Sequence, residues 1–416
     1  MNFKKYLPII AISSASEDGQ LGNISEDLMF LLYQARRENR KLLFVKKWNP
    51  FKKYTKFSAN YMYDLECEFL YKRGFLHKLL SILFGFRDYV VLYLLAKLYY
   101  KTLNKYFSND KNFRTFMLII GFPLGVNRRF NPDALSMNKY IENRKEYNFS
   151  SEFEESLNIE IPKSDSISLE RDLELMGVSK KDWFVCVQVR TKNFFNDVDN
   201  NIKNSSFDNY YETIRYIINE GGKVIRFGDA GLDVENIDGL INYPDSKFKS
   251  EKMDYYIMQK CRYFIGTGSG PRYLALLMHK PTLIVNYTDY WQTPVYKKKD
   301  QFIFKRVYSK KINKYLTLNE IINQDRPYAD MELVVEDNSS EDILLAYIEF
   351  INRIKRDNFD YSSIQEEYKT KIVSLPYADS NFENLFGDYL FTRNYYSNAT
   401  VSNAYLKKYW DCETKS

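Results

Sequence analysis

The stretch that decides the fold is Arg262-Tyr-Phe-Ile-Gly-Thr-Gly-Ser-Gly-Pro-Arg-Tyr-Leu-Ala-Leu-Leu-Met278. Residues 263–265 are apolar and predict a short buried strand. The glycines that follow allow positive φ and the close approach of a ligand to the backbone. Pro271 suits the first position of a helix, where a missing N–H group costs nothing. The stretch therefore predicts a strand, a tight glycine loop and a buried helix.

This loop and helix start predict an anion site. The first N–H groups of a helix have no partner within the helix, and the helix dipole places positive charge there. Phosphates and carboxylates bind at such positions. A close-packed glycine turn without a ligand is the alternative interpretation.

Strands and helices alternate on both sides of this stretch. Strands are predicted at 184–189, 224–227, 240–243 and 282–286, and helices at 207–218 and from Ser250 to Cys261. Residues 184–189 are apolar except for Gln188, as expected for a parallel strand that is covered on both faces. The order predicts a parallel, doubly wound α/β sheet with right-handed crossovers.

Polar residues follow several of these strands. Ligands bind beyond the carboxyl ends of the strands in open parallel sheets. The candidate ligand-binding residues are Gln188, Arg190, Arg226, Asp229, Asp254, Thr267, Gly268, Ser269 and Gly270, with Asn286 after the last strand. Arg190 is suited to bind a diphosphate, the 267–270 turn to donate N–H groups, and Asp229 or Asp254 to accept ribose or sugar hydroxyls.

The N-terminal part predicts a second α/β unit. It contains a strand at 7–13, a loop at 14–23, a helix at 25–38 that begins at Ser25, and a strand at 42–46. The loop lacks the glycine fingerprint of dinucleotide-binding proteins. Residues 55–115 are mostly helical by pattern, and a strand at 117–121 is followed by Asn127, Arg128 and Arg129.

The sequence predicts three regions. Residues 1–178 form an N-terminal Rossmann-like domain with a helical insertion, 179–330 a nucleotide-binding Rossmann-like domain, and 331–416 a helical C-terminal region that packs back on the body. In the third region, an amphipathic helix is predicted at 341–354 with Leu344, Tyr347, Ile348 and Ile351 on one face. A strand-like segment at 301–307 and a capping box at 317–320 precede it.

Composition excludes several classes of protein. The chain has 416 residues, of which 45% are hydrophobic and 27% charged, so it is globular with two or three domains. The net charge of +6 suits an anionic ligand, whereas the scattered lysines do not favour nucleic-acid binding. Four separated cysteines indicate a reducing compartment. Two histidines speak against a histidine-rich metal centre or a Ser-His-Asp triad.

Two further segments have alternative interpretations. Asp197-Val-Asp199 imitates a metal-binding carboxylate pair but lies in a polar loop, so no metal is predicted. Residues 75–103 are the most apolar part of the chain. Arg87 and Asp88 interrupt them, which speaks against a spanning helix and leaves a core helix or a helix on a membrane surface.

The order of motifs resembles a known family. Val185-Cys-Val-Gln-Val-Arg190, Gly222-Lys-Val-Ile-Arg-Phe-Gly-Asp229, Met253-Asp254, Cys261-Arg-Tyr-Phe-Ile-Gly-Thr-Gly-Ser-Gly270 and Asp300-Gln-Phe-Ile-Phe-Lys305 look like bacterial glycosyltransferases that act on surface polysaccharides. The motifs are more distantly similar to the donor half of fucosyltransferase-like enzymes, in which a His-Val-Arg strand end holds the nucleotide diphosphate. Here Gln188 stands where a histidine is usual, whereas Arg190 matches.

The resemblance implies a two-domain GT-B-like enzyme. It would transfer a sugar from a nucleotide-sugar donor to a cell-surface glycan or lipid-linked acceptor, such as lipopolysaccharide or capsule, without a metal or other cofactor. Arg190, the turn at Ser269 and Gly270, and Lys305 would stabilise the departing diphosphate. Glu17 and Asp18 are the candidates for the acceptor's base. The enzyme would be cytoplasmic, with a peripheral contact at the inner face of the membrane.

Two alternatives stay open. One is a nucleotide-dependent oxidoreductase or sugar-modifying enzyme on a Rossmann fold, which requires a glycine fingerprint followed by an acidic residue at the end of the next strand. The other is a non-catalytic assembly protein on a membrane surface, based on residues 75–103 and the lysine clusters.

Overall fold

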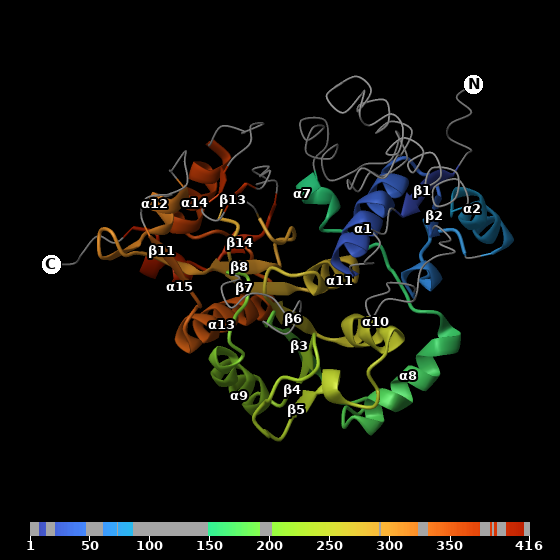
Figure 1. The fold of residues 1–416 in the computed structure, drawn as a ribbon, viewed down its shortest axis with the longest axis horizontal. Helices are drawn as coiled ribbons and strands as arrows, with labels where there is room; N and C mark the ends of the chain where they lie inside the picture. The colour runs from blue at the N-terminus through green and yellow to red at the C-terminus, as the bar shows by residue number, and fades with distance from the viewer. Residues whose placement is uncertain are drawn as a thin grey trace, which may run out of the picture. The chain divides into compact units, whose positions relative to one another are not determined.

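The computed structural model describes residues 8–13, 21–46, 61–72, 74–85, 149–191, 202–290, 293–322, 332–374, 383–384, 387–388 and 397–411. The chain divides into two compact units. Unit 1 comprises Met1–Tyr140 and Leu157–Lys163, and unit 2 comprises Ile141–Ser156 and Ser164–Ser416. Figure 1 shows the elements of each unit.

Unit 1 contains the predicted β-α-β motif. Strand β1 (Ile9–Ser13) pairs in parallel with β2 (Leu42–Lys46), and α1 (Leu21–Arg37) connects them. The helix begins four residues before Ser25, whose hydroxyl donates to the carbonyl oxygen of Leu21 at 2.7 Å. The prediction that Ser25 begins the helix was therefore wrong, because this side chain is buried inside the helix and bonds to the preceding turn.

The other described elements of unit 1 are η2 (Tyr61–Asp64) and α2 (Phe75–Gly85). The main chain joins Glu66 and Glu160 in an antiparallel bridge, which ties the 157–163 segment to this unit. The predicted strand at 117–121 and Asn127, Arg128 and Arg129 lie outside the described residues. No described helix is both long and apolar enough to cross a membrane.

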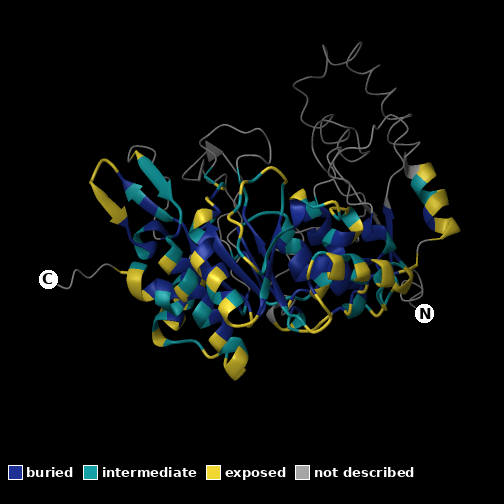
Figure 2. Ribbon diagram, turned by 90° about the horizontal axis from the view of Figure 1, so that it is seen from below, coloured by how far each residue is buried: buried dark blue, intermediate teal, exposed yellow. Residues whose placement is uncertain are grey.

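Unit 2 is built on a parallel sheet of seven strands. Their spatial order is β5-β4-β3-β6-β7-β8-β14. The strands are β3 (Phe184–Gln188), β4 (Lys223–Phe227), β5 (Leu240–Asn242), β6 (Tyr263–Gly266), β7 (Thr282–Tyr287), β8 (Gln301–Phe304) and β14 (Thr400–Val401). Strands β3, β6, β7 and β8 are buried at every position, because both faces of the sheet are covered. Figure 2 shows this buried centre in dark blue.

Helices cover both faces of the sheet (Figure 1). Helices α9 (Tyr211–Asn219) and α13 (Ser340–Arg356) pack together on one face, and α10 (Glu251–Lys260) and α11 (Pro271–Leu277) pack together on the other. The predicted order of strands and helices from β3 to β7 is confirmed. Ser250 caps α10 by accepting the N–H of Met253 at 3.2 Å, as its position before the helix predicts.

The segment predicted as one strand at 301–307 is two. After β8 the chain turns at Lys305 and continues as β9 (Arg306–Ser309), which pairs with β10 (Lys314–Leu316) and β11 (Leu333–Glu336) in a separate antiparallel sheet. The N–H of Lys305 donates to the carbonyl oxygen of Tyr287, and the hydroxyl of Tyr290 donates to that of Lys305, both at 2.9 Å. These contacts hold the turn, which an apolar pattern alone does not reveal.

The C-terminal region contributes to the main sheet. Besides α13 and α14 (Ser363–Ser374), it supplies β14 at the sheet edge and α15 (Asn403–Tyr409), which packs on α13 and α14. The buried face of α13 contains Ile343, Ala346 and Phe350 together with the predicted Tyr347 and Ile351. Leu344 and Ile348 are only half-buried, so the predicted face is rotated toward the sheet.

The remaining described elements are short except for α8. They are α7 (Phe149–Glu152), α8 (Lys163–Leu175), η5 (Asp208–Tyr210), η6 (Tyr243–Asp245), α12 (Leu318–Ile322), β12 (Glu383–Asn384) and β13 (Gly387–Asp388). The predicted capping box is confirmed before α12. Thr317 and Glu320 exchange two hydrogen bonds of 2.8 and 3.0 Å between side chain and main chain.

Candidate functional site

The strand order of unit 2 has one point at which it reverses direction. From β3 the chain crosses to β4 and then β5 on one side, and from β6 it continues to β7 and β8 on the other. Strands β3 and β6 pair directly, with Gln188 opposite Gly266 at their carboxyl ends. In doubly wound sheets, ligands bind beyond the strands at this reversal point. The residues that follow β3 and β6 therefore form the candidate site.

Four predicted residues are brought together at this point. The hydroxyl of Ser269 donates to the side-chain oxygen of Gln188 at 2.7 Å, and the hydroxyl of Thr267 lies 3.4 Å from the same oxygen. The main-chain N–H of Arg190 donates to the Thr267 hydroxyl at 3.3 Å. The N–H of Thr267 donates to the carbonyl oxygen of Gln188 at 3.2 Å. A polar network therefore ties the glycine turn to the end of β3.

The turn keeps some of its N–H groups for its own bonds. The N–H of Ser269 donates to the carbonyl oxygen of Thr267 at 2.7 Å, and that of Arg272 donates to Ser269 at 3.1 Å. The N–H groups of Gly268 and Gly270 make no hydrogen bond with the residues that the structure describes. These two groups are therefore the main-chain donors of the turn that are available to a ligand.

Only glycine fits at two positions of the turn. A Cβ atom at Gly266 would lie 2.6 Å from the ring of Phe264, and one at Gly268 would lie 2.7 Å from the ring of Tyr287. Both rings are buried. The glycines of this turn therefore meet a packing requirement, which agrees with the alternative interpretation of a close-packed turn. The positive φ expected for Gly266, Gly268 and Gly270 is wrong, because none of the three has a positive φ.

Arg190 leads into a second segment at the same edge. Its carbonyl oxygen accepts the N–H of Ser205 at 2.9 Å. Beside this segment the ammonium group of Lys305 lies 2.6 Å from Asp337 and donates to the carbonyl oxygen of Asn204 at 2.6 Å. Burial lowers the pKa of Lys305, and Asp337 opposes that effect. The charge of Lys305 is thus already paired.

Arg226 is also engaged within the protein. Its guanidinium group donates to Asn242 at 2.6 Å, to the carbonyl oxygen of Asp229 at 2.8 Å and to Asp245 at 3.1 Å. Burial lowers the pKa of Arg226, while Asp245 opposes the effect. These contacts join β4 to β5 and shape the loop that carries Asp229.

Asp254 lies in the first turn of α10. Its carboxylate accepts the hydroxyl of Tyr243 at 2.6 Å and a bond from Lys249. Burial raises the pKa of Asp254. The carboxylate predicted to bind sugar hydroxyls therefore has two partners from unit 2 itself.

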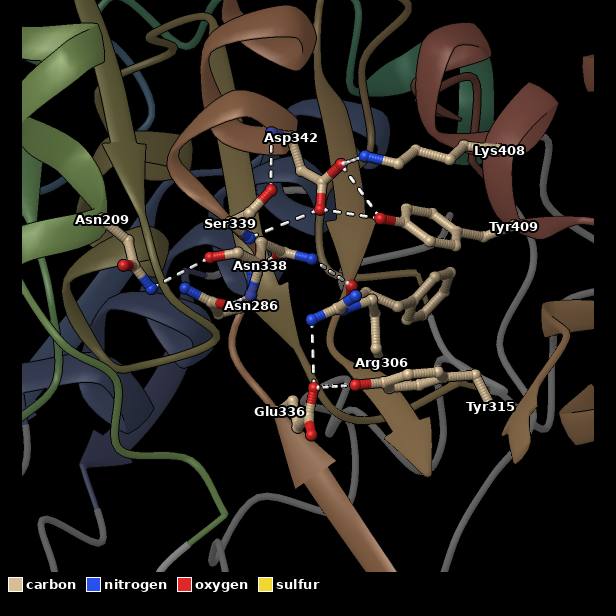
Figure 3. Close-up of polar contacts among 11 residues, drawn as sticks. Asn209, Asn286, Arg306, Tyr315, Glu336, Asn338, Ser339, Asp342, Lys408 and Tyr409 are labelled. Carbon is tan, nitrogen blue, oxygen red and sulfur yellow. Dashed lines mark hydrogen bonds and ion pairs between the residues drawn. The ribbon is translucent and has the colours of Figure 1, made fainter. Parts of the chain in front are cut away.

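Asn286 connects the end of β7 to the start of α13, as Figure 3 shows. Its N–H donates to the side chain of Asn338 at 2.7 Å, and the N–H of Asn338 donates back to the side chain of Asn286 at 2.6 Å. Asn338 also donates to the carbonyl oxygen of Phe304 at 2.6 Å. The sequence pattern placed Asn286 at a strand end but did not reveal Asn338, which lies 52 residues away.

One residue of the site was missed. Arg272 is the second residue of α11, and its side chain is buried beside the glycine turn. The signal in the sequence was a single charged residue between Pro271 and the apolar run that ends at Met278.

Several predicted residues lie outside the described residues. These are Glu17 and Asp18, the candidates for the base, and the Asp197 and Asp199 pair. Within the described ranges, no cluster of three or more histidine, cysteine or acidic residues has the arrangement of a metal site. The described cysteines Cys67, Cys186 and Cys261 are free thiols, two of them buried.

Comparisons with known proteins give weak likenesses only. No family model matches the chain, and no curated protein matches it. A glycosyl transferase of family 9 from Veillonella parvula is 13% identical, with 67% of this chain and 80% of that chain covered and a TM-score of 0.36. The iron-containing dodecameric glycosyltransferase TibC from enterotoxigenic E. coli is 13% identical, with 67% and 59% covered and a TM-score of 0.26.

A second TibC structure is described as a heptosyltransferase in complex with ADP-D-beta-D-heptose. It is 13% identical, with 84% of this chain and 78% of that chain covered and a TM-score of 0.28. At these identities and scores, the likenesses assign neither a family nor an activity to this chain. The resemblance to fucosyltransferase-like enzymes stays a prediction.

Proposed function

We propose that this protein is a glycosyltransferase that moves a sugar from a nucleotide-sugar donor to a cell-surface glycan or related acceptor. The observation that carries the proposal is the reversal point between β3 and β6, where Gln188, Thr267 and Ser269 form one polar network beside Arg190. An open parallel sheet binds nucleotides at this position. The net charge of +6 favours an anionic ligand.

The proposed chemistry is displacement at the anomeric carbon of the sugar. The bond to the diphosphate breaks as the acceptor hydroxyl attacks, so negative charge grows on the departing phosphate oxygens. Arg190 and the N–H groups of Gly268 and Gly270 would stabilise this charge, because donors held in place before the reaction need no reorganisation. Glu17 and Asp18 remain the candidates for the base that accepts the acceptor's proton.

The contacts within unit 2 favour positioning roles for three of the other predicted residues. Lys305, Arg226 and Asp254 are each paired with an oppositely charged side chain. The proposal therefore gives them positioning roles. Lys305 would hold the 204–206 segment, and Arg226 would hold the loop of Asp229, whose carboxylate is the candidate for ribose hydroxyls.

The oxidoreductase alternative is less well supported. In the Rossmann order of this sheet, β3 is the strand after which the glycine fingerprint belongs. Residues 189–194 contain no glycine, although Asp229 does follow the next strand. A dinucleotide is therefore included in the experiment below as a competing ligand.

The test is a thermal-shift screen of UDP, GDP, ADP, dTDP and CMP, their sugars including ADP-D-β-D-heptose, and NADH. We expect one nucleotide and its sugar to raise the melting temperature. Arg190→Ala should abolish the shift and, once an acceptor is found, reduce the rate about 10²–10³-fold. Arg215→Ala is the matched control, because Arg215 is an exposed arginine of α9. A response to NADH alone, or an undiminished response in Arg190→Ala, would contradict the proposal.

A peripheral membrane contact is part of the proposal. Helix α2 exposes five large apolar side chains, Phe75, Leu76, Leu79, Ile82 and Leu83, and Phe75 is 81% exposed. An exposed apolar face of this size is typical of a contact surface. A lipid-linked acceptor would place the enzyme at a bilayer, and a donor made inside the cell would place it on the cytoplasmic side.

A further inference from the structure

The side chain of Arg272 is buried, and no carboxylate of the described residues pairs with it. It is 9% exposed. Its Nη2 atom lies 2.7 Å from the hydroxyl of Tyr273, and its Cζ atom lies 4.5 Å and 5.4 Å from the ring centroids of Tyr273 and Tyr287. Its Nε and Nη1 atoms have no hydrogen-bond partner among the residues that the structure describes. A tyrosine hydroxyl and two aromatic rings are therefore the contacts that the described residues provide to this guanidinium group.

Arg226 is a buried arginine of the same unit that has hydrogen-bond partners within the protein. It is 2% exposed and thus at least as buried as Arg272, yet it has Asn242, Asp245 and a carbonyl oxygen as partners. A buried charge without partners is costly, and contact with aromatic rings offsets only part of that cost. Packing alone therefore gives no reason for a guanidinium group at position 272.

The position of Arg272 relative to the turn indicates what would pair with it. A Cβ atom placed on Gly268 would lie 3.7 Å from Nη1 of Arg272. The guanidinium group thus lies directly against the part of the turn whose N–H group has no acceptor among the described residues. A cation and two free N–H donors at one loop are complementary to a phosphate group.

We propose that Arg272 is a phosphate anchor of the candidate site, where Nη1 donates to the phosphate furthest from the nucleoside while Gly268 and Gly270 donate their N–H groups. This rests on the proposed function in that the phosphate belongs to the donor's diphosphate. Because Nη1 is buried beneath the turn, the backbone around Gly268 shifts when the anion binds. A Cβ atom at position 268 would clash with the ring of Tyr287. Glycine therefore allows the turn to lie close to the guanidinium group of Arg272.

The test measures the binding of inorganic pyrophosphate. Neither the donor sugar nor the nucleoside therefore has to be known. Isothermal titration calorimetry compares the wild-type protein with Arg272→Met, which keeps the aliphatic stem and removes the charge. We expect the affinity for pyrophosphate to fall more than tenfold while the melting temperature without ligand is unchanged or higher. Arg272→Gln serves if the methionine variant fails to fold.

Arg306→Met is the matched control, because Arg306 lies in the separate antiparallel sheet. It should not raise the melting temperature, because it removes the ion pair of 3.0 Å with Glu336, and it should keep the affinity for pyrophosphate within twofold. The proposal is overturned if wild-type protein does not bind pyrophosphate, or if neither Arg272 variant weakens binding by at least fivefold. Weakening of fivefold or more in either variant supports it.

The two proposals fail separately. If no nucleotide sugar binds but pyrophosphate binding depends on Arg272, the transferase proposal fails and the anchor stands. If nucleotide sugars bind through Arg190 while the Arg272 variants bind pyrophosphate normally, only the anchor fails.

Discussion

The side chains of Gln188 and Ser269 meet at 2.7 Å although they lie 81 residues apart in the chain. This contact defines the candidate site at the scale of single residues. Gln188 is neutral at every pH at which the protein folds, unlike the histidine usual in the resembling families. The positive charge offered to a diphosphate therefore rests on arginine side chains, and nucleotide binding should not depend on the ionisation of residue 188.

His279 provides a prediction about pH. It follows α11 with φ of 55°, and burial together with the neighbouring Lys297 and Lys299 lowers the pKa of His279 to about 3. In the unfolded chain the pKa is near 6.5. Between these values the unfolded state binds the proton more tightly, so the stability that His279 contributes is complete above pH 6.5 and is lost as the pH falls.

The variant His279→Asn isolates this effect, because asparagine tolerates positive φ. The free energy of unfolding in urea is measured at pH 7 and pH 5 for both proteins. From pH 7 to pH 5, the free energy of unfolding of the wild-type protein should fall by up to about 2 kcal/mol more than that of the variant. This follows from a slope of about 1.4 kcal/mol per pH unit for one proton. Equal losses would show that the histidine titrates normally in the folded state.

At the scale of elements, loops are held by side chains from distant elements. Figure 3 shows the paired amides of Asn286 and Asn338 at the start of α13, and close by Asp342 with Lys408 and Tyr409 from α15. The side chains of Ser339 and Asp342 form a capping box at this helix start. The carboxyl end of β7 is thereby fixed to two helices from the C-terminal region.

The prediction at the scale of elements concerns helix α2. A double variant Ile82→Glu with Leu83→Glu replaces two exposed apolar side chains, so it should leave folding intact and reduce binding to vesicles by at least tenfold. Binding is measured by sedimentation with anionic vesicles at low and high salt. The matched control is Ile167→Glu, which replaces an exposed apolar side chain of α8. Absence of wild-type binding, or equal binding by all three proteins, would remove the membrane contact from the proposal.

At the scale of the whole molecule, the C-terminal region completes the core of unit 2. Strand β14 pairs with β8 about a hundred residues earlier in the chain, with Thr400 opposite Gln301 and Val401 opposite Phe302. Helix α15 buries Tyr405 and Leu406, and Trp410 follows it. The region is therefore part of the fold of unit 2.

Removal of residues 375–416 tests this conclusion. Each large apolar side chain that loses its burial costs about 1.5–3 kcal/mol, and Val401, Tyr405, Leu406 and Trp410 are all buried. Their sum is comparable to the whole stability of a typical domain, about 5–15 kcal/mol. We expect the shortened protein to be insoluble or to lose cooperative thermal unfolding in calorimetry, whereas Lys407→Ala, on the exposed face of α15, should unfold like the wild type.

Much of the main sheet was predictable because its signals are local. Continuous apolar runs marked β3, β6 and β7, and Ser250 and Pro271 marked the helix starts. The strand ends then placed Gln188, Arg190, Thr267 and Ser269 at one edge. Their mutual contacts follow from the parallel pairing of β3 with β6, which the order of elements alone did not specify.

The sequence by itself determined the α/β class of this chain, the glycine turn and its neighbours, since hydrophobic period, helix caps and turn residues act within a few positions. Only the tertiary structure decided which charges are already paired. Arg226 and Lys305 meet their charged partners through the packing of separate elements, whereas Nε and Nη1 of Arg272 have no hydrogen-bond partner among the described residues. The physical reason is that the free energy of a buried charge depends on the atoms around it, and residues that are distant in the chain supply those atoms.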